Sequence, residues 1–368
     1  MKNNHNEWKI IFLLPNLSLD KSIGNDNIAI VPANDPRLEK IVSTNKLARS
    51  LVENFEDQFG RKMHPAVLMI RAKAPEFLIL NETIVGFRNI FALSCIIKGH
   101  EHSMKSSFVA YPVYSDHFDF YPISLSEDND GFITSSPSIF GFDDDSQCFK
   151  GQTSPALINP ASINATPDEN LFQLLENAWE RCFLNGNFGE WRTTTLFRSL
   201  EMAYQASSMP FKNHSTIYDH GSSVSLWVSA LEILSHPRKG KADLCSVLNL
   251  LDIFEWKDIK IKKRAYKICF HNREYKVNLV QKLYKELYDT RNDFLHGNPV
   301  SQNRLYPFRK KGRHTIIRYA PLIYKVALLS FLKQHNLRLK RANWQKEYIS
   351  NLINERSLSE AFLKLKNQ

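Results

Sequence analysis

The strongest constraint on the fold is a change of pattern near residue 166. Beyond it, almost every apolar run repeats at steps of three and four residues, which is the spacing of amphipathic helices. The change coincides with Thr166-Pro167-Asp168-Glu169, where threonine precedes a proline at the first helical position and a glutamate at the third. We therefore expect Thr166 to cap the first helix of a separate, all-helical domain.

The chain before this point is expected to form a mixed domain over residues 1–165, so the predicted fold class is α+β overall. Helical spacing follows Pro36 and resumes near Asn81. Residues 124–165 are rich in Ser, Asp, Asn, Pro and Gly, which predicts a flexible linker. A sensing or regulatory role with an unidentified trigger is one interpretation of this domain. Short strand-like runs are expected at Lys9–Leu14, Ala66–Arg71, Ser107–Tyr114 and His117–Ile123.

The second domain is predicted to span residues 166–340 as a helical bundle, followed by a basic helical tail over 341–368. Apolar residues cover most of the circumference of Ser222–His236, so we expect it to be a central core helix. The other expected helices are Leu171–Phe183, Arg192–Ser207, Lys241–Leu251, Val277–His296 and Pro321–Gln334.

Composition narrows the class of protein. The chain has 368 residues, 43% hydrophobic and 23% charged, which is typical of a globular protein. Its apolar runs near the N-terminus are too short to span a bilayer, and its five cysteines are dispersed, without a CxxC pair. We expect a cytoplasmic location with no membrane partner, no metal and no cofactor. His100 and His102, on either side of Glu101, have an alternating spacing that could hold a metal, but no further ligand lies nearby in the sequence, which favours a surface loop.

Charge is unevenly distributed along the chain. Residues 1–169 contain 15 Lys/Arg and 21 Asp/Glu, whereas residues 170–368 contain 33 and 17, a net charge of +16. This asymmetry points to a polyanion such as RNA, although a solvated basic surface explains it equally well. Within residues 255–277, basic and aromatic residues alternate in a way that suits RNA, unless the aromatics anchor the segment to the core. The candidate RNA-binding residues are Lys262, Lys263, Arg264 and Lys267.

One pair of residues carries possible chemistry. Arg291 and His296 lie at the end of an amphipathic helix, and Gly297 follows where a left-handed cap would sit. A permanently charged guanidinium near an imidazole is the smallest set of side-chain groups that can cleave a phosphodiester without a metal. The same spacing recurs at Arg309 and His314, but without apolar periodicity around it, so context must decide. Glu232, a carboxylate in an otherwise apolar helix, could pair with Arg291 or with another residue.

Three segments follow one another in the helical domain: Leu196-Phe197-Arg198-Ser199-Leu200-Glu201-Met202-Ala203, Leu226-Trp227-Val228-Ser229-Ala230-Leu231-Glu232-Ile233-Leu234 and Leu287-Tyr288-Asp289-Thr290-Arg291-Asn292-Asp293-Phe294-Leu295-His296-Gly297. Together they resemble the HEPN family, in particular its Apea-like branch. The resemblance covers residues of about 170–335 and implies a helical bundle, ribonuclease activity in antiphage defence or stress response, and a homodimer. It also implies that Arg291, Asn292 and His296 form the active site.

The chemistry explains why a dimer is expected. RNA cleavage without a metal needs a base for the 2′-OH and an acid for the leaving 5′-oxygen, and each chain has one histidine in the motif. Two chains would supply both, so the site is predicted to be composite. Arg291 would stabilise the phosphate, and Asn292 would orient the histidine or the substrate. Toxin members of the family often have a tyrosine two residues after the histidine, where this chain has Asn298.

Two further interpretations remain open from the sequence. The helical domain could be a non-catalytic dimeric module that binds RNA, a nucleotide or a protein partner through the same groove. Alternatively, Arg291 and His296 could simply cap a helix.

Overall fold

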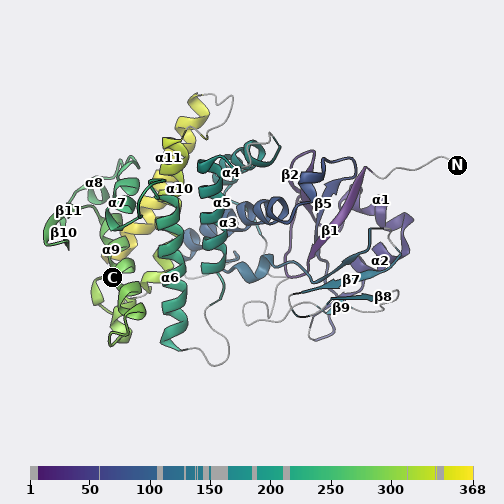
Figure 1. The fold of residues 1–368 in the computed structure, drawn as a ribbon, viewed down its shortest axis with the longest axis horizontal. Helices are drawn as coiled ribbons and strands as arrows, with labels where there is room; N and C mark the ends of the chain where they lie inside the picture. Colours follow the sequence, from purple (N-terminus) through teal and green to yellow (C-terminus); the bar gives the residue numbers. More distant parts are fainter. Residues whose placement is uncertain are drawn as a thin grey trace. The chain divides into compact units, whose positions relative to one another are not determined.

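The computed structural model describes residues 7–57, 59–105, 111–127, 130–136, 138, 140–143, 149–150, 165–184, 189–209, 216–312, 314–335, 337 and 344–367. The chain divides into two compact units (Figure 1). The first comprises residues 1–81 and 114–166, and the second residues 82–113 and 167–368. Small sheets dominate the first and helices the second, so the fold is α+β. Among the described helices, none has the length and apolar character needed to cross a bilayer.

The first unit is built on a four-stranded antiparallel sheet in the order β1-β5-β3-β2. Alternate residues of these strands, such as Val31, Val67 and Met69, pack in one core with Leu38 and Leu51 of the helices α1 and α2. The period-two pattern of the strands therefore buries one sheet face under two helices. The bounds are β1 Trp8–Leu14, β2 Ile23–Gly24, β3 Ile28–Val31, β5 Ala66–Arg71, α1 Pro36–Thr44 and α2 Lys46–Glu53.

The predicted strands at 9–14 and 66–71 match β1 and β5. The other two predictions were wrong where the structure describes them. Residues 111–114 form no strand, and Ser115–Phe118 is a 3₁₀ turn (η2), which buries His117. Residues 106–110 lie outside the described residues. A further 3₁₀ turn, Glu76–Ile79 (η1), precedes the first long helix.

The described part of the predicted linker is structured. Three short strands, β6 (Ile123–Leu125), β7 (Phe132–Ser135) and β8 (Phe140–Asp143), pair as an antiparallel meander. Phe149 of β9 (Phe149–Lys150) stacks on Phe55 of β4 (Phe55–Glu56). The prediction of a flexible linker over 124–165 was wrong for these strands, because Phe132 and Phe149 are core residues. Residues 144–148 and 151–164 lie outside the described residues.

The second unit begins earlier than the sequence analysis expected. The 25-residue helix α3 (Asn81–Lys105) belongs to it rather than to a domain ending at residue 165. The indole of Trp179 donates to the carbonyl of Thr83 (2.9 Å), and Phe87 packs edge-on against the same indole (5.3 Å between ring centroids). Because α3 is apolar on most sides, it needs helical neighbours all round, and the 167–368 segment provides them.

The remaining helices of this unit follow residue 168. They are α4 Glu169–Trp179, η5 Glu180–Leu184 (a π-helical turn), α5 Trp191–Ala206, α6 Ile217–Leu234, α7 Leu244–Asp252, α8 Ile259–Lys262, α9 Leu279–Leu295, η6 Gln302–Leu305, η7 Pro307–Arg309, η8 Ile316–Tyr319, α10 Ala320–Gln334, α11 Trp344–Leu363 and η9 Lys364–Asn367. A hairpin of β10 (Tyr266–Phe270) and β11 (Arg273–Val277) precedes α9.

Helices α6 and α10 form the centre of the helical unit. α6 packs against α5, α7, α9 and α10, as expected for a core helix, and Figure 1 shows α5 and α6 side by side. The Ser199 hydroxyl of α5 donates to the carbonyl of Ala230 in α6 (2.8 Å) and lies 2.7 Å from the Tyr324 hydroxyl of α10. Trp227 of α6 packs edge-on against Tyr324 (5.5 Å). The two contacts of the Ser199 hydroxyl and the packing of Trp227 on Tyr324 thus fix α5, α6 and α10 relative to one another.

A buried ammonium of α10 joins this helix to two more elements, α3 and the start of α4. Lys325 of α10 is fully buried, and its Nζ lies 2.6 Å from a carboxylate oxygen of Glu101 in α3 and 2.6 Å from one of Asp168. Asp168 also caps α4, because its side chain accepts from the backbone N–H of Leu171 (3.1 Å). The prediction that Thr166 caps this helix was therefore wrong by two residues. Asp168 takes the position because its carboxylate can both cap the helix and neutralise Lys325.

The predicted tail is part of the same unit. α11 begins at Trp344, and its buried side chains include Leu358 and Phe362. Glu355 of α11 accepts hydrogen bonds from the backbone N–H groups of Lys257 (3.1 Å) and Asp258 (3.2 Å). The prediction of a separate tail over 341–368 was therefore wrong for the described residues of this segment. Residues 341–343 and 368 lie outside them.

We predict that Lys325→Met will lower the free energy of unfolding by about 3–5 kcal/mol, because it leaves Glu101 and Asp168 buried without a cation. Burial alone would raise the pKa of Asp168, but the Lys325 ammonium outweighs it and holds that pKa below its ordinary value of 3.8. This stabilisation is present above pH 3.8 and lost as pH falls through the lowered pKa, so the mutational cost should shrink in acid.

The matched control is Lys333→Met on the same helix. Its Nζ pairs with Glu255, but the two side chains are 41% and 84% exposed. Solvent screening should limit this loss to about 1 kcal/mol or less. Urea unfolding at pH 7 and at a pH below 3.8 measures both variants. Equal losses at Lys325 and Lys333 would contradict the account of the buried network.

Candidate active site

Helix α9 presents the Arg291 to His296 run. Asn278 and Gln281 form a reciprocal capping box at its start, with side chain to backbone distances of 3.0 and 3.1 Å. At its end, His296 is the C-cap residue, and its backbone N–H donates to the carbonyl of Asn292 (3.0 Å). Gly297 has φ +69°, the left-handed conformation that the sequence predicts there. The motif therefore lies at a helix end, as expected.

Arg291 is held from two sides. Its Nη2 lies 2.6 Å from Oε2 of Glu232 on α6, and its Nη1 donates to Oδ1 of Asn292 (3.1 Å). The guanidinium also lies 5.3 Å from the ring centroid of Tyr288. The ion pair that the sequence suggested between Arg291 and Glu232 is present in the structure. Two of the five guanidinium N–H donors are used in these contacts, so others remain for an anion.

The electrostatics around Glu232 are those of a half-buried carboxylate. Burial raises the pKa of Glu232, and the Arg291 cation offsets only part of this rise. Tyr284 of α9 is fully buried beside the pair, and its hydroxyl oxygen has no hydrogen-bond partner among the described residues. Burial, and then the charge of Glu232, raise the pKa of Tyr284 far above its usual range. The site thus combines the ion pair of Arg291 and Glu232 with a buried hydroxyl of Tyr284 that has no hydrogen-bond partner among the described residues.

Sequence reasoning missed Tyr284 and Tyr288 as neighbours of the site. The signal that could have found them is helical spacing, since Tyr284, Tyr288 and Arg291 are four and three residues apart and share one face of α9. The two tyrosine rings lie 6.3 Å apart.

His296 lies apart from the other candidate residues. Its side chain is exposed and has no hydrogen-bond partner in the described part of the chain, whereas Arg291 is only 20% exposed and turned toward α6. Five residues on a helix rotate a side chain by about 140°. The structure therefore brings Arg291, Asn292 and Glu232 together and leaves His296 facing solvent.

The end of α9 is fixed by contacts of neighbouring residues. Asp293 pairs with Arg304 of η6 (2.7 Å) and accepts from the side-chain amide of Asn298 (3.2 Å). Phe294 packs against Gly221 of α6, where an added methyl group would lie 2.5 Å from Cδ1 of the ring. Asn298 therefore has a structural role in the turn. Gly221 permits the close approach of α6 and α9 at the motif.

The candidate RNA-binding residues divide into two kinds. Arg264 pairs with Asp252 (2.6 Å), and Lys267 pairs with Glu274 across the β10–β11 hairpin (2.8 Å). Lys262 and Lys263 are exposed and have no ion pair among the described residues. Trp256, one of the interleaved aromatics, is buried. That aromatic anchors the segment to the core and is not available for base stacking.

The other sequence candidates do not form a site. His100 and Glu101 lie in α3 rather than in a loop, and Glu101 is bound to Lys325. Burial lowers the pKa of His100 to about 4, so it is neutral. No group of three metal-ligating side chains occurs among the described residues. The second Arg–His pair differs from the first, because Arg309 ends a 3₁₀ turn and His314 is buried.

Comparison of the chain with family models, with curated proteins and with solved structures gave no match.

We predict that Gly221→Ala will lower the free energy of unfolding, because the added methyl group collides with Phe294 at the α6–α9 contact. The overpacking should cost about 1–3 kcal/mol, which exceeds the gain of about 1 kcal/mol from the higher helix propensity of alanine over glycine. Ser222→Ala, at the exposed neighbouring position, is the control and should be almost neutral.

A double mutant isolates the contact. Phe294→Leu should cost less in the Gly221→Ala background than in wild type, since the smaller side chain relieves the collision. Chemical denaturation of the four proteins gives the coupling free energy. Strictly additive losses would show that Gly221 and Phe294 do not constrain each other.

Proposed function

We propose that the helical unit is a HEPN-type bundle and that the protein is a metal-independent endoribonuclease acting in antiphage defence or stress response. Arg291, Asn292 and His296 are its proposed catalytic residues. The observation that carries the proposal is the arrangement at the end of α9. A guanidinium oriented by Glu232 and Asn292 lies five residues before an imidazole that solvent can reach.

The chemistry follows from these groups. The proposed reaction moves a proton from the 2′-OH to one histidine, and the 2′-oxygen attacks phosphorus as the bond to the 5′-oxygen breaks. A second histidine gives a proton to that leaving oxygen. The products are a 2′,3′-cyclic phosphate and a free 5′-OH. Arg291 stabilises the charge that builds on the phosphate, through the N–H donors that Glu232 and Asn292 do not use.

A homodimer supplies the second histidine in this proposal. The surface at the end of α9 supports it, because the apolar side chain of Leu295 beside His296 is 62% exposed and that of Tyr218 on α6 is 68% exposed. Tyr218 packs edge-on against Phe294, so the two helices present one surface. Apolar groups beside an exposed imidazole favour contact with a second copy over contact with water.

The alternative function is a dimeric module that binds RNA, a nucleotide or a protein partner without cutting. The 2.6 Å ion pair between Arg291 and Glu232 favours it, because the arginine already has an anionic partner inside the fold. Under this alternative, the basic half of the chain, with a net charge of +16 over residues 170–368, gives salt-dependent RNA binding alone.

We predict that His296→Ala will reduce the rate of RNA cleavage in the presence of EDTA by at least about 100-fold, since it removes the proposed acid and base. The matched control is His64→Ala, which removes an exposed histidine of the first unit and should leave the rate unchanged. Gel analysis of a labelled single-stranded RNA measures both. Cleavage by His296→Ala at the wild-type rate, or no cleavage by wild type with retained RNA binding, would favour the alternative.

A composite site makes a second prediction. When wild-type and His296→Ala chains are co-expressed in equal amounts and pair at random, about a quarter of the dimers contain two histidines. Cleavage per total protein should then fall to about a quarter of the wild-type value. A fall to about half would mean that each chain carries an independent site.

A further inference from the structure

The β10–β11 hairpin has one side that the helical core covers only in part. Alternate residues of a strand, and the residues opposite them on an antiparallel partner, point to the same side. By this rule one side carries Tyr266, Ile268 and Phe270 of β10 with Val277, Tyr275 and Arg273 of β11. Ile268 and Val277 are buried, whereas Arg273 and Tyr275, closer to the turn, are exposed. Figure 1 shows the hairpin at the margin of the helical unit, so a cation and a ring extend beyond the core.

A turn of η7 packs against the same side of the hairpin. The ring of Phe308 stacks on that of Tyr266, with 5.7 Å between the ring centroids. The backbone N–H of Phe308 donates to the carboxylate of Glu286 in α9 (2.7 Å). Phe308 and Arg309 have φ +56° and +57°, which is unusual for residues other than glycine. The stacking and the hydrogen bond therefore hold a strained turn in place, and the residues after it are presented beside the hairpin.

The exposed cations of this region lack an acidic partner. Arg273, Arg309, Lys310 and Lys311 are exposed and have no ion pair among the described residues. The carboxylates of adjacent elements already have cations, since Glu274 pairs with Lys267 (2.8 Å), Glu286 with Lys282 (3.4 Å) and Asp289 with Lys285 (2.5 Å). Unpaired cations favour a polyanion, and the exposed ring of Tyr275 beside them offers a face on which a base can stack.

The segment before the turn connects this region to the candidate active site. Arg304 of η6 pairs with Asp293 near the end of α9 (2.7 Å), and Phe308 reaches Glu286 of the same helix. Asp293 and Glu286 are seven residues apart, which is two helical turns or about 10 Å. His296 follows Asp293 by three residues and so lies on the same side of α9. A strand held beside His296 can therefore continue along this segment to the hairpin.

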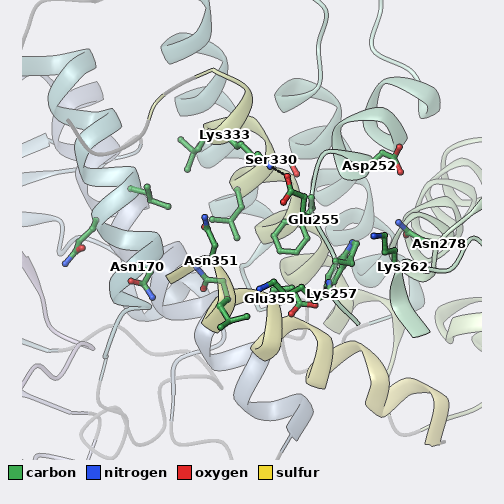
Figure 2. A pocket seen from close by; sticks show the side chains of 18 of the residues that line it. Asn170, Asp252, Glu255, Lys257, Lys262, Asn278, Ser330, Lys333, Asn351 and Glu355 are labelled. Atoms are coloured by element: carbon green, nitrogen blue, oxygen red, sulfur yellow. Dashed lines mark hydrogen bonds and ion pairs between the residues drawn. The ribbon is translucent and has the colours of Figure 1, made fainter. Parts of the chain in front are cut away.

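Two basic residues singled out from the sequence belong to a different surface. Lys262 and Arg264 line a cavity of about 960 Å³ beside α11, together with Asp252, Glu255 and Glu355 (Figure 2). Arg264 is paired with Asp252. Carboxylates in this wall disfavour a polyanion, so the cavity is not part of the surface at the hairpin.

We propose that Arg273 and Tyr275 of the hairpin, with Arg309, Lys310 and Lys311 of the adjacent loop, form a binding surface for single-stranded RNA. The cations bind phosphates, and the Tyr275 ring stacks on a base that a duplex would keep paired. The choice of RNA as the ligand rests on the proposed function. The surface holds the part of the strand that leads away from the cleavage site.

The test measures binding of a fluorescein-labelled single-stranded RNA of about 12 nucleotides to the full chain carrying His296→Ala, so that the RNA stays intact. Adding Arg309→Gln and Lys310→Gln together should weaken binding by about fivefold or more. The slope of log affinity against log salt should become shallower by about 1.4, which is about 0.7 for each lost phosphate contact. The matched control, Lys40→Gln with Lys46→Gln, removes two exposed lysines of the first unit and should change neither quantity.

Substitutions of the ring test the stacking. Tyr275→Thr keeps a residue that favours strands and removes the ring, so it should weaken binding of the single strand by about fivefold or more. Tyr275→Phe keeps the ring and should bind as the parent chain does. A duplex of the same sequence should bind more weakly than the single strand and be insensitive to Tyr275→Thr. Should Tyr275→Thr fail to fold, the two loop substitutions still decide the outcome.

The results separate this surface from the nuclease. Binding that depends on Arg309, Lys310 and Tyr275, without cleavage by the wild-type chain, would keep the surface and remove the ribonuclease. Cleavage by the wild-type chain, with unchanged binding by these variants, would keep the ribonuclease and overturn the surface. No measurable RNA binding, or equal affinity for the duplex and the single strand, would also overturn it.

Discussion

The helical unit depends on the buried ammonium of Lys325. An unpaired ammonium cannot stay in an apolar interior, so α10 can occupy the core only with Glu101 of α3 and the cap of α4 beside it. With α10 in place, Tyr324 fixes α5 and α6 through Ser199 and Trp227. α6 in turn presents Glu232 to Arg291. The geometry of the candidate active site thus rests on a charge network that contains none of its residues.

Local patterns in the sequence predict some parts of the fold, whereas parts that depend on contacts between distant residues could not be predicted. The helices after residue 168 follow from apolar periodicity, and the cap at Gly297 follows from the backbone that glycine allows. The assignment of α3 to the second unit could not be predicted, because Glu101 and Lys325 lie 224 residues apart. Likewise, a segment rich in turn residues gave no sign that Phe132 and Phe149 are core residues.

At the candidate site, the sequence predicted residue types better than their arrangement. The spacing of Arg291 and His296 predicts that the two side chains point in different directions, as they do. The depth of the Arg291 to Glu232 pair, the buried phenol of Tyr284 and the contact of Gly221 with Phe294 depend on where α6 crosses α9. No local pattern encodes that crossing.

The proposed mechanism requires that the 2′-oxygen of the substrate attack its own phosphate. The most direct test of it is mass spectrometry of RNA fragments produced by the purified protein in EDTA. The account predicts fragments that end in a 2′,3′-cyclic phosphate with a 5′-OH on the next fragment, and their disappearance with Arg291→Ala. Fragments with a 5′-phosphate and a 3′-OH would contradict it, because they arise from attack by water instead of the 2′-oxygen.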